Sequence, residues 1–152
     1  MKIWIRNRQK PIPLDQKKIK RVVQKILASL GLPEAELSLL LVDDREIQEL
    51  NHRFLGRDKP TNVLAFSMRE GAFASLHPHL LGDLVISIEM AKRQSKQSGM
   101  SEMEMLTLLL IHGILHLLGY EHEGNKKDAR EMAIKQKELF QKFRNGGILG
   151  DE

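Results

Sequence analysis

Hydrophobic residues follow one another most densely between residues 104 and 118. This stretch, EMLTLLLIHGILHLL, places apolar side chains on almost every side of a helix, so the helix is expected to lie inside the protein core. Ser101, with Glu104 three residues later, has the spacing of a capping box, in which two side chains close the first turn of a helix. The pattern therefore predicts a buried central helix that runs to about Leu118.

Four other segments repeat apolar residues every three or four positions, which predicts amphipathic helices. A glycine follows each of the first three, and glycine favours the left-handed turn that ends a helix. The four segments cover about residues 14–30, 44–55, 89–98 and 127–143.

Two of these helices have inward faces that the sequence defines in detail. The helix at 44–55 starts with a second capping box, Asp43 and Glu46, and is expected to turn Ile47, Leu50 and Phe54 inward. The inward face of the last helix is predicted to comprise Ala129, Met132, Ala133, Gln136, Leu139, Phe140 and Phe143.

Short apolar segments at 2–7, 37–42, 63–66 and 82–88 predict four strands. The run LSLLLV is apolar except for Ser38, as expected of a strand that is covered on both faces. Because strands alternate with helices, we predict an α/β fold: a single layered domain with a mostly parallel four-stranded sheet and about five helices. We expect this domain to span residues 1–145 and a flexible tail to follow at 146–152.

Composition restricts the chemistry and the cellular location. The chain of 152 residues contains no cysteine, so a metal site would have to use histidine or carboxylate ligands. No apolar run is long enough to cross a membrane. The N-terminal segment MKIWIRNRQK lacks the apolar region of a signal peptide, and we therefore expect a cytoplasmic protein.

The positive charge is concentrated at the N-terminal end. The net charge is +4, and residues 1–25 contain nine lysines and arginines but only one acid, Asp15. Such an end could bind a polyanion through phosphate contacts, or it could be the solvated face of the first helix. Charge alone does not choose between these alternatives.

Three histidines lie at the end of the central helix, in the sequence HGILHLLGYEH. His112 and His116 are four residues apart and therefore project from the same helix face. Gly119 permits a turn that would bring His122 to the same point as a third ligand. Three histidines leave one position of tetrahedral zinc open, so the spacing predicts a catalytic zinc site at the end of the buried helix.

The spacing is that of a zinc peptidase, but the glutamate that would act as its base is replaced by Gly113. Peptide hydrolysis would then need Glu121 or Glu123 as the base. Phosphodiester hydrolysis needs cations that stabilise the negative charge of the transition state instead. Candidate cations lie beside the turn DKPTN: Arg53, Arg57 and Lys59.

Three segments together resemble the YbeY family of single-strand-specific endoribonucleases, the rRNA maturation factors. HGILHLLGYEH is similar to the family signature H-G-x-L-H-L-x-G-Y-D-H, and GRDKPTNVLAF resembles its G-K-D-K-P-T-D/N-V-L-S-F segment. LGDLVIS is similar to the strand G-D-[IV]-x-I-S. The resemblance implies one zinc ion held by His112, His116 and His122, cleavage of single-stranded RNA or rRNA, and a role with the small ribosomal subunit in rRNA maturation and ribosome quality control.

The chain departs from the family pattern at the rim of this site. Leu55 stands where family members commonly carry an arginine to which a catalytic role has been ascribed, so Arg57 or Arg53 would have to supply the charge. Glu121 replaces the usual aspartate of the signature. Arg57 and Glu121 are accordingly the candidate catalytic residues.

Two other functions remain open at this point. The chain could be a metal-dependent peptidase, or a non-catalytic ribosome-binding protein in which zinc is structural. Imidazole ligands also suit nickel and cobalt, so the sequence does not select zinc among these metals.

Overall fold

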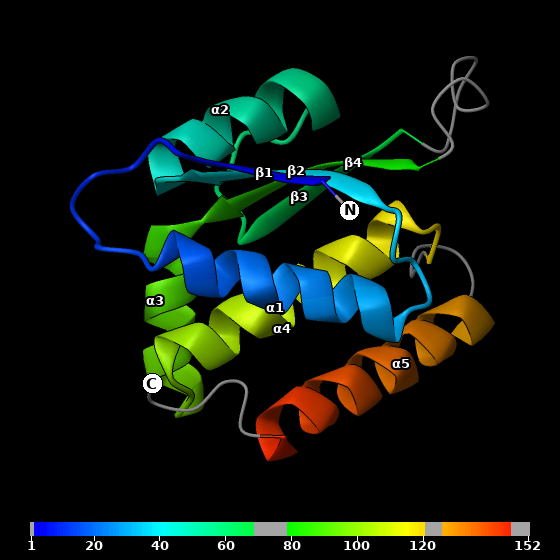
Figure 1. Ribbon diagram of the computed structural model, residues 1–152. Helices are drawn as coiled ribbons and strands as arrows, with labels where there is room; N and C mark the ends of the chain where they lie inside the picture. Colours follow the sequence, from blue (N-terminus) through cyan, green and yellow to red (C-terminus); the bar gives the residue numbers. More distant parts are fainter. Residues whose placement is uncertain (1, 69–78, 121–125, 147–152) are drawn as a thin grey trace.

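A computed structural model describes residues 2–68, 79–120 and 126–146 (Figure 1). The sequence predicted four strands and about five helices, and both predictions are confirmed. In chain order the elements are β1 Lys2–Asn7, α1 Gln16–Ser29, β2 Glu36–Val42, α2 Asp44–Leu55, β3 Val63–Ser67, β4 Leu80–Ser87, α3 Ile88–Ser98, α4 Glu102–Leu117 and α5 Lys126–Asn145.

The sheet is mostly parallel, as predicted, with the strand order β1-β2-β4-β3. β1 and β4 both pair with β2 in parallel, whereas β3 runs antiparallel to β4 and forms one edge of the sheet. β3 and β4 follow one another in the chain, and antiparallel neighbours of this kind need no helical crossover.

The helices cover the two faces of the sheet unequally (Figure 1). α2 lies alone on one face, while α1 and α4 lie on the other and α5 packs against the outer side of α4. α2 covers the last residues of β2 and β4, where Val42 and Val85 are buried with Ile47, and this accounts for the apolar end of β2, Leu39–Val42.

The central helix is the most deeply buried helix, as its sequence predicted. Ten of its sixteen residues are buried, so α4 contacts the sheet on one side and α5 on the other. Its capping box forms in both directions: Ser101 Oγ accepts from Glu104 N at 3.0 Å, and Glu104 Oε1 accepts from Ser101 N at 2.9 Å. α4 thus begins at a fixed point and carries its histidines at the far end.

Helix α2 is anchored at its start to α3, to the end of β4 and to Arg8, which follows β1. Asp43 caps the helix by accepting from Glu46 N at 2.9 Å, and the Glu46 carboxylate lies 2.9 Å from Arg8. Asp44 accepts from Ser87 Oγ at 2.6 Å and pairs with Arg93 at 2.7 Å. Partial burial opposes ionisation of Asp44, but these two partners outweigh it and lower the pKa of the carboxyl.

Two predictions of inward-facing residues were wrong. Phe54 was expected in the core, yet 59% of its surface is exposed, because it packs at the edge of the sheet against Phe66 of β3. Ala133 on α5 is exposed as well, since only Met132, Leu139, Phe140 and Phe143 of that face are buried against α4. β4 also starts at Leu80, two residues earlier than the sequence indicated.

No single helix in the described part of the chain has the length and hydrophobicity needed to cross a membrane. α3 and α4 reach that length only together, across a bend of 114°.

Gly82 allows the edge strand and the central helix to approach β4 closely. Its φ of 143° lies in a region that side chains rarely adopt, and a Cβ there would collide with the carbonyl oxygen of Phe66 on β3. The same Cβ would lie 3.1 Å from Leu117 Cδ2 on α4. Glycine at this position is therefore required by both the backbone conformation and the packing.

Replacing this glycine should destabilise the whole fold. We predict that Gly82→Ala lowers the free energy of unfolding by about 2–5 kcal/mol, the combined cost of backbone strain and overpacking. Urea unfolding followed by circular dichroism measures this. Gly31→Ala is the control, because Gly31 has a φ of 74° but nothing within 4 Å of its Cβ position, so about 1 kcal/mol is expected from φ alone. Equal losses for the two variants would contradict the packing argument.

Candidate functional site

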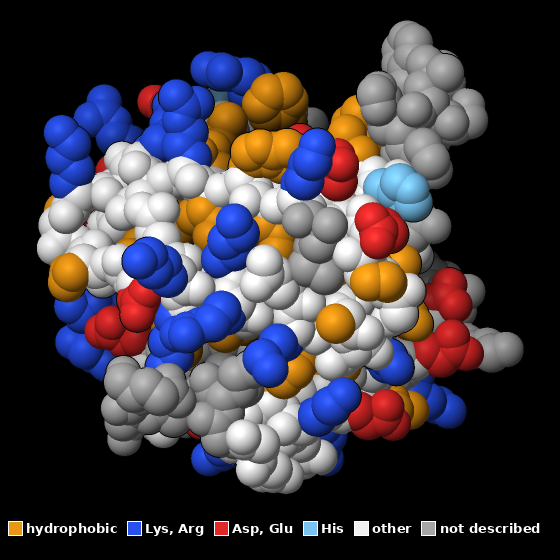
Figure 2. All heavy atoms as spheres, viewed as in Figure 1, with side chains coloured by type: hydrophobic (Ala, Val, Ile, Leu, Met, Phe, Trp, Pro, Cys, Tyr) orange, Lys and Arg blue, Asp and Glu red, His pale blue; other side chains and the backbone are white. Residues whose placement is uncertain are grey.

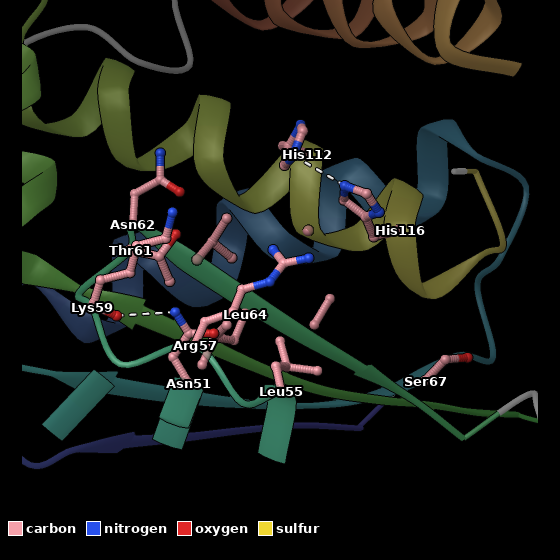
Figure 3. Close-up of a pocket in the computed structure, with 13 residues that line it drawn as sticks. Asn51, Leu55, Arg57, Lys59, Thr61, Asn62, Leu64, Ser67, His112 and His116 are labelled. Carbon is pink, nitrogen blue, oxygen red and sulfur yellow. Dashed lines mark hydrogen bonds between the residues drawn. The ribbon is translucent and has the colours of Figure 1, made fainter. Parts of the chain in front are cut away.

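One pocket of about 490 Å³ lies between the end of α4 and the loop that joins α2 to β3 (Figure 3). It is lined mainly by polar side chains, and no Asp or Glu among the described residues contributes to it. Its walls are formed by α2 (Asn51, Leu55), the loop (Arg57, Lys59, Thr61, Asn62), β3 (Val63, Leu64, Ala65, Ser67) and α4 (His112, Gly113, His116).

The two helical histidines converge in this pocket. His112 and His116 are partly buried, and their Nε2 atoms lie 3.1 Å apart. Their rings meet edge to face, with centroids 4.6 Å apart. The spacing of four residues therefore brings two ring nitrogens to one point, as the sequence predicted.

Gln136 on α5 determines the tautomer of His112. Its side-chain oxygen Oε1 lies 2.7 Å from His112 Nδ1. An amide oxygen only accepts hydrogen bonds, so Nδ1 carries the proton and Nε2 presents a lone pair to the pocket.

This arrangement fits a metal ion. Two zinc–nitrogen bonds of about 2.0–2.1 Å at a tetrahedral angle place their nitrogens roughly 3.3 Å apart, which is close to the observed 3.1 Å. A second polar group that holds the outer nitrogen of a ligating histidine is also usual in metal sites. Within residues 2–68, 79–120 and 126–146 no group of three potential ligands is assembled. The expected third ligand His122 and the candidate residues Glu121 and Glu123 lie outside the described residues.

Gly113 is required where α4 meets the sheet. A Cβ at this position would lie 2.7 Å from Leu84 Cδ2 on β4 and 3.2 Å from Val63 Cγ2 on β3. Leu84 is fully buried and has little room to move. Leu84 and Val63 thus occupy the space that the Cβ atom of a glutamate at position 113 would need.

The loop between α2 and β3 is held by buried and local hydrogen bonds. Gly56 adopts a φ of 70° and ends α2, which turns the chain back along the helix. Asn51 is only 2% exposed. Its side-chain Nδ2 atom donates to the backbone carbonyl of Lys59 at 2.9 Å, and its backbone carbonyl accepts from Arg57 N at 3.3 Å. The Asn51 Oδ1 atom is buried and has no hydrogen-bond partner among the described residues.

The far end of this loop is anchored to β4 and α3. The Asn62 carbonyl accepts from Ser87 N at 3.0 Å, and Asn62 Nδ2 donates to Gln94 Oε1 at 3.1 Å. Asp58, in the middle of the loop, accepts from Gln48 Nε2 at 3.0 Å. The loop therefore has a defined conformation before any ligand binds.

The three candidate cations do not all lie in the pocket. Arg57 and Lys59 line the pocket, and Figure 3 shows the Arg57 guanidinium directed into it toward α4. Arg53 lies instead in a hollow on the other side of α2, together with Arg8 and Glu46. Leu55, at the position of the missing arginine, lies at the rim and is 50% exposed.

The basic N-terminal segment does not reach this pocket, since none of its residues lines it. Its charges lie on β1 and on the exposed face of α1.

Sequence reasoning missed two residues that shape the site. The sequence placed Gln136 on the inward face of the last helix but gave it no role in the site. A polar residue among the hydrophobic residues of that face was the signal for such a role. Asn51 gave a similar signal, because it lies one turn after Ile47 on the buried face of α2. A polar residue on an otherwise apolar helix face must find a partner, which here is part of the site.

The chain matches a family model described as Endoribonuclease YbeY over residues 4–144. A relative of that name from Syntrophus aciditrophicus is 48% identical over 141 residues, which cover 92% of this chain and 88% of the relative. Another from Geobacter sulfurreducens is 41% identical over 150 residues, which cover 98% and 100% of the two chains. The solution structure of TM1509 from Thermotoga maritima matches with a TM-score of 0.64 and 25% identity over 99% of this chain and 97% of that one.

A divalent metal held by His112 and His116 should depend on Gln136. We predict that Gln136→Ala lowers the affinity for Zn²⁺ about 10- to 100-fold, because His112 loses the acceptor that fixes its ring and tautomer. Competition with a colorimetric chelator measures the dissociation constant. Gln141→Ala is the matched control, since Gln141 is exposed on the same helix. An unchanged affinity in Gln136→Ala would show that the contact does not support a metal.

Proposed function

Because the chain belongs to the YbeY family of endoribonucleases, we propose that it cleaves single-stranded RNA in the pocket between α4 and the 56–62 loop. The observation that carries this proposal is the meeting of a histidine pair with Arg57 and Lys59 in one pocket. An RNA phosphodiester is an anion whose cleavage adds further negative charge. A pocket with cations and no described acid favours such a substrate.

We further propose that His112, His116 and His122 hold one zinc ion. The 3.1 Å separation of two ring nitrogens and the Gln136 contact support the first two ligands. His122 is assigned by its place in the HGILHLLGYEH signature. When bound, zinc supplies Lewis acidity that activates water and polarises a phosphoryl oxygen.

The chain's own side chains then have distinct tasks in this reaction. Arg57 directs its guanidinium into the pocket and stabilises the negative charge that develops on the phosphate. Lys59 adds a second positive charge on the same loop. Asn51 positions both residues, because it bonds to the backbone at Arg57 and at Lys59. Glu121 remains a candidate for proton transfer by its place beside His122 in the sequence.

The RNA that this family membership favours is ribosomal. We propose that the chain acts in rRNA maturation and ribosome quality control with the small ribosomal subunit as partner, and that it works in the cytoplasm, where that substrate is found. The exposed basic residues of β1 and α1 lie away from the pocket, and their positive charge favours contacts with a large RNA.

A metal-dependent peptidase is the less favoured alternative. Leu84 and Val63 pack against Gly113, at the position where such a peptidase carries its glutamate base, so the packing disfavours an acid there. A ribosome-binding protein without catalysis is the other alternative. It would retain zinc and RNA binding but would not cut RNA.

Cleavage of a labelled single-stranded RNA by wild type and by His116→Ala tests the proposed function. Wild type should cut and contain about one zinc per chain, whereas His116→Ala should lose both properties. Both proteins are purified in parallel, so equal cleavage by the two would identify a contaminant. Failure of both to cut while both bind RNA would favour the non-catalytic alternative.

Arg57 should supply the charge that Leu55 cannot. We predict that Arg57→Ala lowers kcat/KM for RNA cleavage about 10- to 100-fold, because one cation facing the phosphate is lost. Arg53→Ala is the matched control, since Arg53 lies outside the pocket. Both variants should unfold at the same urea concentration as wild type. Full activity in Arg57→Ala would remove this residue from the mechanism.

A further inference from the structure

A pair of phenylalanine rings stands at the end of α2, next to the pocket. Phe54 is 59% exposed, and its ring lies 5.6 Å from that of Phe66 on β3, at an angle of 67°. The neighbouring residue, Leu55, is 50% exposed and lines the pocket itself. An apolar surface therefore continues from the pocket to the Phe54 ring.

The two rings lie across the edge strand from the histidines. Successive side chains of a strand point to opposite faces. Ala65 and Ser67 of β3 thus line the pocket, whereas Phe66 does not line it and packs on the α2 side in the same cluster as Ile47. Because β3 is an edge strand, no further strand separates the pocket from the ring pair. A ligand strand that leaves the pocket over this edge would meet Phe54.

An exposed aromatic ring beside cations suits one class of ligand. Single-stranded RNA alternates phosphates with bases, and proteins bind it by pairing a basic groove with aromatic rings on which bases stack. Here Arg57 and Lys59 supply the basic groove and Phe54 the ring. Figure 2 shows hydrophobic side chains next to lysine and arginine side chains over α2.

We propose that Phe54, held in place by Phe66, is a stacking platform for a nucleobase next to the phosphate bound in the pocket. The proposal rests on the proposed function and adds a base-binding subsite to it. Phe66 restricts the Phe54 ring before RNA binds, so less conformational freedom is lost on binding. Stacking tolerates any base, which matches a preference for single strands over a particular sequence.

Binding without cleavage tests the platform directly. The RNA is a fluorescein-labelled decamer, and its affinity is measured by anisotropy in a His116→Ala background so that it stays intact. Adding Phe54→Ala should weaken binding about 5- to 100-fold, the range of one lost base–aromatic stack. Adding Phe54→Trp should keep binding within about twofold, because the larger ring stacks at least as well. Ile134→Ala, which removes an equally exposed apolar side chain on α5, should change nothing.

Salt dependence separates stacking from charge. The slope of log Kd against log salt concentration should stay unchanged in Phe54→Ala. In Arg57→Ala the slope should fall by about 1, because one phosphate contact is lost. Replacing single bases of the decamer by abasic sites identifies the stacked base. The abasic site at that position should weaken binding to the His116→Ala protein but not to the protein that also lacks Phe54.

The Phe54→Trp variant gives an independent readout. The chain contains one natural tryptophan, Trp4 on β1, at the opposite edge of the sheet. RNA should therefore quench the fluorescence of the new tryptophan and leave that of Trp4 unchanged.

The outcomes distinguish this proposal from the proposed function. If wild type cleaves RNA and Phe54→Ala binds it as tightly as before, the platform is wrong and the nuclease assignment stands. The ring pair would then be a surface for a protein partner. If wild type neither binds nor cleaves RNA, both proposals fall together. Circular dichroism checks that each variant is folded, which the exposure of Phe54 leads us to expect.

Discussion

The close approach of α4 to the sheet is the constraint on which the site depends. Gly113 lets the helix rest on Leu84 and Val63, and Gly82 lets β4 approach both β3 and α4. Because Gly113 faces the sheet, His112 and His116 flank that contact and turn toward the edge at β3. The packing of the core therefore determines both where the histidines point and which strand closes their pocket.

The same packing limits the chemistry that the histidines can support. The space beside Gly113 is filled by Leu84 and Val63, so an acid at that position would have to displace packed side chains. The charges around the histidines come from a different part of the chain, the loop after α2. That loop contributes Arg57 and Lys59, and cations of this kind stabilise the negative charge that develops on a phosphate.

Local pattern predicted the elements well and their meeting points poorly. The caps, the apolar period and the four-residue histidine spacing act within one element, so the sequence revealed α4, the parallel strands and the convergence of His112 with His116. Arg53 and Arg57 could not be told apart, because only the path of the chain after Gly56 turns one of them into the pocket. Phe54 was misplaced for a similar reason, since helical period does not reveal where the sheet ends.

The buried amide of Asn51 indicates what kind of catalysis this loop is built for. Its Oδ1 atom has no partner among the described residues, and such an atom costs about 1–3 kcal/mol. The same side chain fixes the backbone at Lys59, so the charges of the loop are already in position. Preorganised charge lowers a barrier because nothing has to reorient when negative charge develops. A phosphodiester gains negative charge during cleavage, so the held loop is consistent with RNA as the substrate.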